Sequence, residues 1–197
     1  MRRRFMGTKR RVYIQDLNGN LYTRDEWVHF PANRMANGVA VLTENCEFVI
    51  STNDSPADLE WGGYGVGLYG IAGSADSTVA KTDYKGFENT DIIIGQLGSG
   101  KAPAAEYCRS VLFRNGKKGY LGSLGEWEEV CKNKVEVDAC MSLIGGTSIK
   151  AGYPGYWAST LYSIYDSWSV YFNDIGSPLY QYHDKDLCYR VRAFALL

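Results

Sequence analysis

The chain lacks a long apolar segment, an excess of charge of either sign, and an apolar stretch behind its basic start. No part of its 197 residues approaches the roughly twenty consecutive apolar positions that cross a bilayer, so we expect no membrane insertion. A secretory signal has an apolar segment directly after its basic residues. Here Gly7, Thr8 and Lys9 stand at that place, which argues against a secretory signal. The formal net charge of −1 argues against a general nucleic-acid partner.

Sites for catalysis and metals are also scarce. The five cysteines are odd in number and show no CxxC spacing, so free thiols are expected in place of disulfides or zinc. Only His29 and His183 are available as bases, and no GxSxG segment accompanies them. Residues 95–101 match GxxxxGK, but Ala102 lacks the hydroxyl that holds magnesium and Pro103 follows at once. We therefore predict a glycine turn at a helix end, no cofactor, no metal and no enzyme.

What the first sixty residues contain is a basic start and two hairpin patterns. Residues 11–28 predict two short strands around Asn18-Gly19, a dipeptide that accepts the positive φ of a tight turn. Residues 38–51 repeat the pattern around a turn at 43–45. The basic run within 2–11 is typical of a solvated tail, with an anionic or protein partner as the alternative. We predict an N-terminal β-hairpin arm over residues 1–60 for assembly or attachment, with a second copy of the chain or a virion protein as its partner.

Helix patterns occupy the middle of the chain. The sequence predicts a helix capped at 89–91 and running to residue 97, and another over 103–110 that opens on a proline. Ser123 and Glu126 have the spacing of a capping box for a third helix. Its expected apolar face comprises Leu124, Trp127, Val130 and Cys131, and the carboxylates expected on its exposed side are Glu126, Glu128 and Glu129.

From Tyr153 onward the pattern changes to strands. Residues 168–173 alternate with a period of two, which predicts Trp168, Val170 and Phe172 in the core and Ser169, Tyr171 and Asn173 outward. Residues 189–194 alternate likewise and predict a closing strand. Strands, then helices, then strands again predict an α+β domain.

The same C-terminal stretch is rich in tyrosine. Eight of the fifteen tyrosines lie between Tyr153 and Tyr189, mixed with tryptophan and short polar residues. Such side chains offer a large contact area for little lost rotamer freedom, as recognition surfaces do. The composition therefore predicts a binding face, and the plain alternative is an irregular β region with a tyrosine-rich surface.

Four segments resemble, in order, the landmarks of the C-type-lectin-like fold shared by formylglycine-generating-type and DUF1566-type domains. They are GYLGSLGEW at 119–127, YWAST at 156–160, WSVYF at 168–172 and RVRAF at 190–194. The resemblance covers about residues 61–197. The whole chain, including KGFENTDIII and APAAEYCRS, is similar to tail or surface proteins of gut Bacteroidales and their phages. Some of these are targets of diversity-generating retroelements, which rewrite the end of a ligand-binding gene.

The resemblance implies a C-type-lectin-like domain over 61–197 whose fixed framework carries a variable face within about 156–194. The framework residues it implies are Trp157, Trp168, Val170, Phe172, Val191 and Phe194. The ligand-binding residues it implies are Tyr165, Asp166, Ser169, Tyr171, Asn173, Asp174, Tyr180, Tyr182, His183, Asp184, Asp186 and Leu187. Adenine-directed variation does not produce Gln181 or Lys185, so both are expected in the framework.

Two departures narrow the function that the resemblance implies. The chain has no EPN or QPD triplet, and residues 172–174 are only a faint echo of WND, so calcium-dependent sugar binding is not implied. Oxidase members need two active cysteines near the end, where only Cys188 lies. The expected function is that of a receptor-binding protein on a phage tail tip or bacterial surface, with a host-surface protein or glycan as partner. An oxidase relative and a structural virion or pilus subunit are the alternatives.

Overall fold

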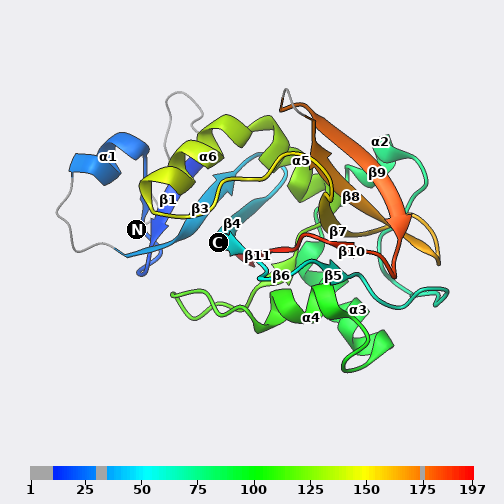
Figure 1. Cartoon of the computed structure of the whole chain (residues 1–197). Helices are drawn as coiled ribbons and strands as arrows, with labels where there is room; N and C mark the ends of the chain where they lie inside the picture. Colours follow the sequence, from blue (N-terminus) through cyan, green and yellow to red (C-terminus); the bar gives the residue numbers. More distant parts are fainter. Residues whose placement is uncertain (1–10, 30–34, 174–175) are drawn as a thin grey trace.

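The computed structural model describes residues 11–29, 35–173 and 176–197. Helices and antiparallel strands both contribute, which confirms the α+β class (Figure 1). Most of the basic start and Asp174 lie outside the described residues.

The largest sheet has six strands in the order β2-β1-β3-β4-β11-β6. Its strands are β1 (Val12–Asp16), β2 (Leu21–Tyr22), β3 (Ala36–Leu42), β4 (Glu47–Asp54), β6 (Tyr120–Leu121) and β11 (Arg192–Leu196). The second predicted hairpin is confirmed, and so are the turn and the strand pairing of the first. Gly19 takes the positive φ of 82° in the first turn, and the Thr43 amide donates to the Cys46 carbonyl in the second.

The predicted arm is part of this sheet. Strand β4 pairs with β11, with Ile50 opposite Phe194, so the first hairpins and the C-terminal strand share one ladder. An appended arm would bury its apolar side chains separately, whereas Ile14, Phe48 and Ile50 belong to the same buried cluster as Phe194. The expectation of an appended arm is therefore corrected. A division of function between residues 1–60 and 61–197 stays a prediction.

The end of the first predicted hairpin is also corrected. Strand β2 has only two residues, and helix α1 (Arg24–His29) replaces the strand expected there. The Thr23 amide donates to Glu26 Oε2 over 2.8 Å, and the Glu26 amide donates to Thr23 Oγ1 over 3.3 Å. This reciprocal capping box starts α1 at Arg24, two residues after β2 ends at Tyr22.

Helices cover both faces of the six-stranded sheet. Val39 and Val41 face a cluster that includes Trp127 of α5 (Leu124–Lys132) and Val137 of α6 (Lys134–Leu143). Ala40 faces the opposite cluster, built with α3 (Gly86–Leu97) and α4 (Pro103–Ser110). Because β3 alternates between two buried clusters, the sheet is the middle layer of three (Figure 1).

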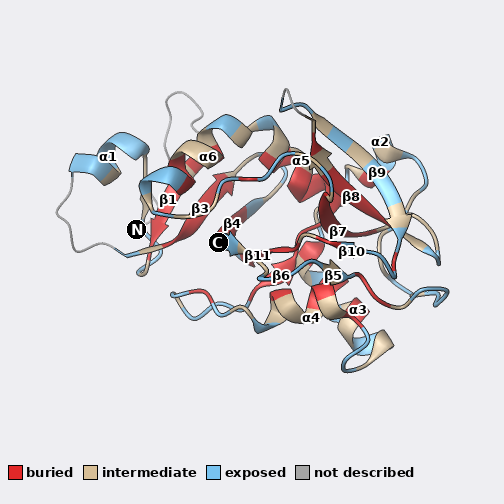
Figure 2. Cartoon of the chain, in the orientation of Figure 1, coloured by how far each residue is buried: buried red, intermediate tan, exposed pale blue. Residues whose placement is uncertain are grey.

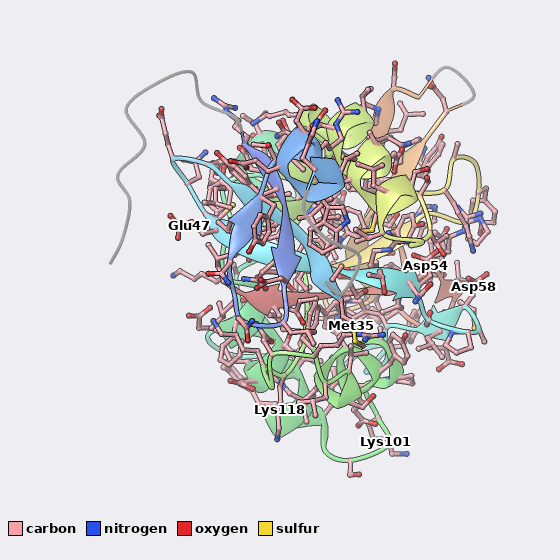
Figure 3. All side chains as sticks on the ribbon, turned by 90° about the vertical axis from the view of Figure 1, so that its left-hand side faces the viewer. Met35, Glu47, Asp54, Asp58, Lys101 and Lys118 are labelled. Carbon is pink, nitrogen blue, oxygen red and sulfur yellow. The ribbon has the colours of Figure 1, made fainter. Side chains whose placement is uncertain are left out.

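The helix over 103–110 is confirmed, and the one expected to start at Asn89 begins earlier, at Gly86. Asn89 lies inside the helix and donates to Asp83 Oδ2 over 2.8 Å, so its amide joins a buried network instead of capping the end. The predicted glycine turn is confirmed by φ values of 84° and 75° at Gly98 and Gly100. The neighbouring Lys101 lies on the side formed by α3 and α4 (Figure 3).

The capping box at the start of α5 is confirmed, because the Ser123 amide donates to Glu126 Oε2 over 2.8 Å. The expected exposure of its carboxylates is wrong for Glu126 and Glu129, which are buried. Glu126 also accepts from the Tyr120 hydroxyl over 2.8 Å, and Glu129 pairs with Lys132 over 3.0 Å. For Glu126 these partners replace the water that a carboxyl group loses on burial, whereas Glu129 Oε2 is buried without a hydrogen-bond partner among the described residues.

The C-terminal strands form two smaller sheets. The first contains β7 (Tyr156–Leu161), β8 (Asp166–Phe172) and β9 (Pro178–Asp184), and the second pairs β10 (Cys188–Tyr189) with β5 (Leu59–Glu60). The predicted closing strand over 189–194 is divided: its start belongs to β10 in the two-stranded sheet, and its end belongs to β11 in the six-stranded sheet. The short helix α2 (Ser77–Ala80) follows the glycine-rich segment over 61–73. Within the described ranges, none of the helices combines the length and apolar character of a membrane span.

Candidate ligand-binding face

Strand β9 lies at the edge of the three-stranded sheet, on the side of the molecule opposite α1 (Figure 1). Its residues are exposed or half-buried along its whole length, whereas β7 and β8 are almost entirely buried (Figure 2). Seven register pairs join β9 to β8, among them Tyr182 with Trp168. A surface strand is therefore attached along its full length to a buried one.

The expected framework is buried, as predicted. Exposure is 3% or less for Trp157, Trp168, Val170, Phe172, Val191 and Phe194. The indoles are also fixed in direction, since Trp157 Nε1 donates to the Leu59 carbonyl over 2.9 Å and Trp168 Nε1 donates to the Ser74 carbonyl over 2.8 Å. These bonds connect the three-stranded sheet to strand β5 and to the loop at Ser74, both distant in sequence.

An aromatic groove opens beside β9. Tyr182 stacks on Tyr162 with a centroid separation of 3.7 Å and an interplanar angle of 9°. Trp168 meets the Tyr162 ring edge-on at 5.4 Å. The hollow has a volume of about 460 Å³ and is lined by Ala75, Ser77, Trp168, Tyr180, Gln181 and Tyr182. We call this feature the β9 groove.

The expected ligand-binding residues divide by exposure. The exposed ones are Tyr165, Tyr182, Asp184, Asp186 and Leu187, and the half-buried ones are Asp166, Tyr171, Asn173, Tyr180 and His183. Only Tyr180 and Tyr182 of this set line the β9 groove. Asp174 lies outside the described residues.

Ser169 is a correction, because it is fully buried and not outward-facing. It lies between Trp157 and Gln181 in register, and its hydroxyl is 3.1 Å from His183 Nδ1. Burial lowers the pKa of His183, although the charges of Asp166 and Asp184 oppose this shift. A serine with no exposure offers no nucleophile to a substrate, so the Ser–His contact is structural.

The two tyrosines of β9 share a face with the core. Opposite residues of an antiparallel pair point to the same side, so Tyr180 accompanies Val170 and Tyr182 accompanies Trp168. Tyr180 is half-buried: its hydroxyl donates to Glu128, and Lys81 Nζ lies 4.2 Å from its ring centroid. The groove is thus the point where the buried face of the sheet reaches solvent.

Acidic groups gather at the far end of β9. Asp166 lies opposite Asp184 in register. The pKa of Asp184 is raised, mainly by desolvation and then by the hydrogen bond and the negative charge of Asp166. Beneath them Lys185 is fully buried, with Nζ donating to the Ile164 carbonyl over 3.0 Å and lying 4.8 Å from the Trp61 ring. Desolvation lowers its pKa to about 8.

Lys185 therefore lies in the framework, as expected, whereas Gln181 is exposed. No group of three histidine, cysteine or acidic side chains within the described ranges is arranged to hold a metal ion. All five cysteines are free thiols.

Three tyrosines that the sequence reasoning did not assign lie beside the expected face. Tyr162 is the stacking partner of Tyr182, and the Tyr64 ring centroid lies 5.2 Å from that of Tyr165. The Tyr153 hydroxyl accepts from the Tyr189 hydroxyl over 3.2 Å. For Tyr153 and Tyr162 the abundance of tyrosine in the C-terminal stretch was the available indication, whereas Tyr64 lies in the glycine-rich segment over 61–73. Alternation alone does not reach them, because they lie in or next to loops.

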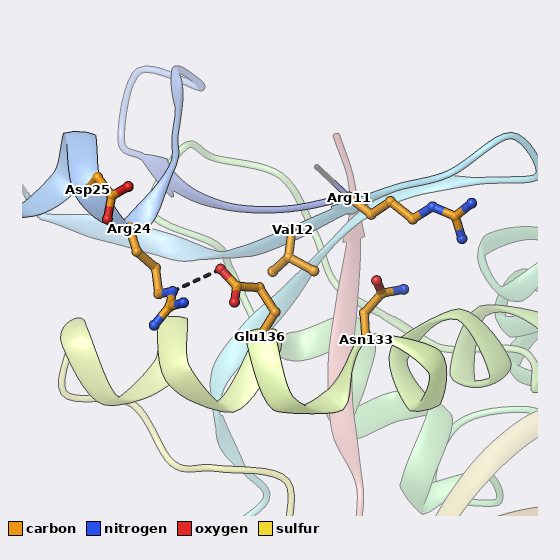
Figure 4. Close-up of a pocket in the computed structure, with 6 residues that line it drawn as sticks. All are labelled: Arg11, Val12, Arg24, Asp25, Asn133 and Glu136. Atoms are coloured by element: carbon orange, nitrogen blue, oxygen red, sulfur yellow. Dashed lines mark hydrogen bonds and ion pairs between the residues drawn. The ribbon is translucent and has the colours of Figure 1, made fainter. Parts of the chain in front are cut away.

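A second hollow of about 290 Å³ lies between β1 and α6, lined by Arg11, Val12, Arg24, Asp25, Asn133 and Glu136 (Figure 4). Arg24 Nε donates to Glu136 over 2.8 Å across it. Arg24 and Glu136 in this hollow already pair with each other, which leaves less of its charge for a ligand. The β9 groove is therefore the better candidate site.

Comparison with known proteins gives no relative: no protein-family model, curated protein or solved structure matches the chain.

Proposed function

We propose that this chain is a receptor-binding protein whose β9 groove and adjoining loops hold a host-surface protein or glycan. The observation that carries the proposal is the contrast between β8 and β9. Trp168 and Val170 are buried, while Tyr182, directly beside them, has an exposure of 49%. Exposed aromatic side chains on a fixed framework are typical of recognition surfaces.

The framework also permits the face to vary. The side chains of Tyr165, Asp184, Asp186 and Leu187 are exposed, so their replacement removes little buried contact. A rigid framework limits the conformational entropy lost when a ligand orders the face. These properties support the further proposal that the face is diversified by a retroelement on a C-type-lectin-like domain.

The aromatic residues of the four sequence landmarks support that assignment. Trp127, Trp157, Trp168 and Phe194 are all buried, as residues retained for folding should be. We further propose display on a phage tail tip or a bacterial surface, where many copies would convert weak single-site affinity into avidity.

Binding of the purified protein to bacterial surface material tests the proposal. We expect Tyr165→Ala, Tyr171→Ala and Tyr182→Ala each to weaken binding, with a loss of about 1–3 kcal/mol for a ring that contacts the ligand centrally. The control is Tyr69→Ala, since Tyr69 is 85% exposed and lies outside the β9 groove. Wild-type binding by all three face variants would refute the proposed face.

The diversification proposal has a separate test in the flanking DNA. We expect a near-copy of the codons for about residues 156–194, differing at adenines, beside a reverse-transcriptase gene. Its absence would refute diversification while leaving ligand binding intact.

A further inference from the structure

We infer that the β9 groove binds an uncharged glycan without calcium, one sugar ring lying against Tyr182. This inference deepens the proposed function and rests on it. It names one ligand class for a face that would otherwise accept either proteins or glycans.

The lining of the groove is uncharged at neutral pH. Ala75, Ser77, Trp168, Tyr180, Gln181 and Tyr182 combine apolar surface with hydroxyl and amide groups. Sugar rings present the same combination: an apolar C–H face and a rim of hydroxyl groups. A groove that holds such a ring therefore needs flat apolar contact at its centre and hydrogen-bonding groups around it.

The flat contact is already ordered. Tyr182 is held by its stack on Tyr162, and Trp168 closes the corner at 6.1 Å from Tyr182 with its own indole nitrogen bonded to the Ser74 carbonyl. Fixed rings lose little rotamer freedom when a ligand docks, so weak contacts suffice for binding. The stack also brings the Tyr162 and Tyr182 hydroxyls together, and their hydrogen bond is the first cause of the raised pKa of Tyr162.

The charges around the groove argue against an anionic ligand. Asp184 follows Tyr182 by two positions on the same sheet face and lies opposite Asp166, so an acidic sugar at Tyr182 would meet two carboxylates. The ammonium group of Lys81 lies over the Tyr180 ring, whose hydroxyl bonds to Glu128. The Lys81 ammonium group therefore already contacts the Tyr180 ring, which argues against its serving as the partner of an anionic ligand.

Affinity electrophoresis through gels containing single polysaccharides tests the inference. The gels contain neutral glucan, mannan, galactan or xylan, with alginate as the anionic arm, all in EDTA; a decaproline peptide serves as a competitor. We expect at least one neutral polysaccharide to retard the wild type, and Tyr182→Ala to weaken that retardation at least tenfold. Tyr182→Phe retains the ring and should keep most of the binding, while Tyr69→Ala should match the wild type. Circular dichroism of each variant excludes unfolding as the cause.

Each other outcome overturns the inference. Retardation by no neutral polysaccharide in EDTA, retardation by alginate alone, or displacement by decaproline would each contradict a calcium-independent, uncharged glycan as ligand. Equal retardation of Tyr182→Ala and the wild type would move the ligand away from the groove. If the face variants still lose binding to bacterial surface material, the proposed function stands and only the ligand class fails.

Discussion

Glu126 shows how one buried side chain makes stability depend on pH. Burial raises its pKa to about 7, although hydrogen bonds from Ser123 and Tyr120 stabilise the charged form. The unfolded state loses this proton near pH 4.5, earlier than the folded state. The protonated Glu126 therefore contributes its full stabilisation of the folded state below about pH 4.5, and this contribution is lost as the pH rises through about 7.

We expect Glu126→Gln to remove this dependence. Relative to the wild type, the variant should lose about 2 kcal/mol more unfolding free energy at pH 5 than at pH 8, by linkage over the interval between the two pKa values. Urea denaturation at both pH values measures the difference. Glu88→Gln is the control, because Glu88 is exposed on α3 and its substitution should have the same effect at both values. Equal losses for Glu126→Gln at pH 5 and pH 8 would contradict the assignment.

At the scale of an element, helix α3 contains two glycines with opposite surroundings. A Cβ added at Gly86 would lie 2.2 Å from Glu126 Oε2 and 2.8 Å from the Ser123 amide nitrogen, whereas one added at Gly95 meets no atom within 4 Å. The first glycine permits α3 to approach the start of α5. The second only lowers helix propensity.

The same substitution should therefore have opposite effects in one helix. We expect Gly95→Ala to stabilise the protein by about 0.5–1 kcal/mol, and Gly86→Ala to destabilise it by about 1–3 kcal/mol through overpacking. Thermal and urea unfolding of the two variants give the comparison. A stabilising Gly86→Ala would show that the contact between α3 and α5 is looser than described.

At the scale of the whole molecule, the sheet connects segments distant in sequence. Strand β11 pairs with β4 on one side and β6 on the other. Arg192 at its start is fully buried and donates to Asp54 of β4 over 2.6 Å. Breaking such a pair by removing one partner leaves a buried charge without compensation.

A fragment spanning 61–197 should therefore not fold alone, because β11 would lose β4 and the Arg192 partner. We expect little dispersion in its amide NMR spectrum and a recovered native spectrum when residues 1–60 are co-expressed as a separate chain. A well-dispersed spectrum for the fragment alone would restore the division at residue 60.

Local patterns predicted local structure well. The turns at Gly19 and Gly98, the capping box of α5 and the inward set of β8 all follow from neighbouring residues, and all are confirmed. One miss is also local, because the Thr23–Glu26 capping box starts α1 where a strand was expected. Other misses involve contacts between segments. Glu126 is buried by its partners Tyr120 and Ser123 and by the approach of α3, which no helical period reveals.

The candidate face was predictable only in part, for the same reason. Alternation along β8 identified the core, but Ser169 is covered by residues from neighbouring strands. The groove needs the stack of Tyr162 on Tyr182, twenty residues apart, and a wall from residues 75–77. Composition predicted a binding face in this region, whereas the shape of the groove depends on tertiary contacts that composition does not reveal.

The position of β11 between β4 and β6 has a consequence for synthesis. Strand β6 has no neighbour in the six-stranded sheet until residues 192–196, which form β11, have left the ribosome. A stop codon or frameshift within the proposed variable stretch would therefore yield a product without the strand that joins β4 to β6, and such a product would be exposed to proteases. Under the proposed diversification, folding would thereby check each copy for an intact reading frame through the codons that change.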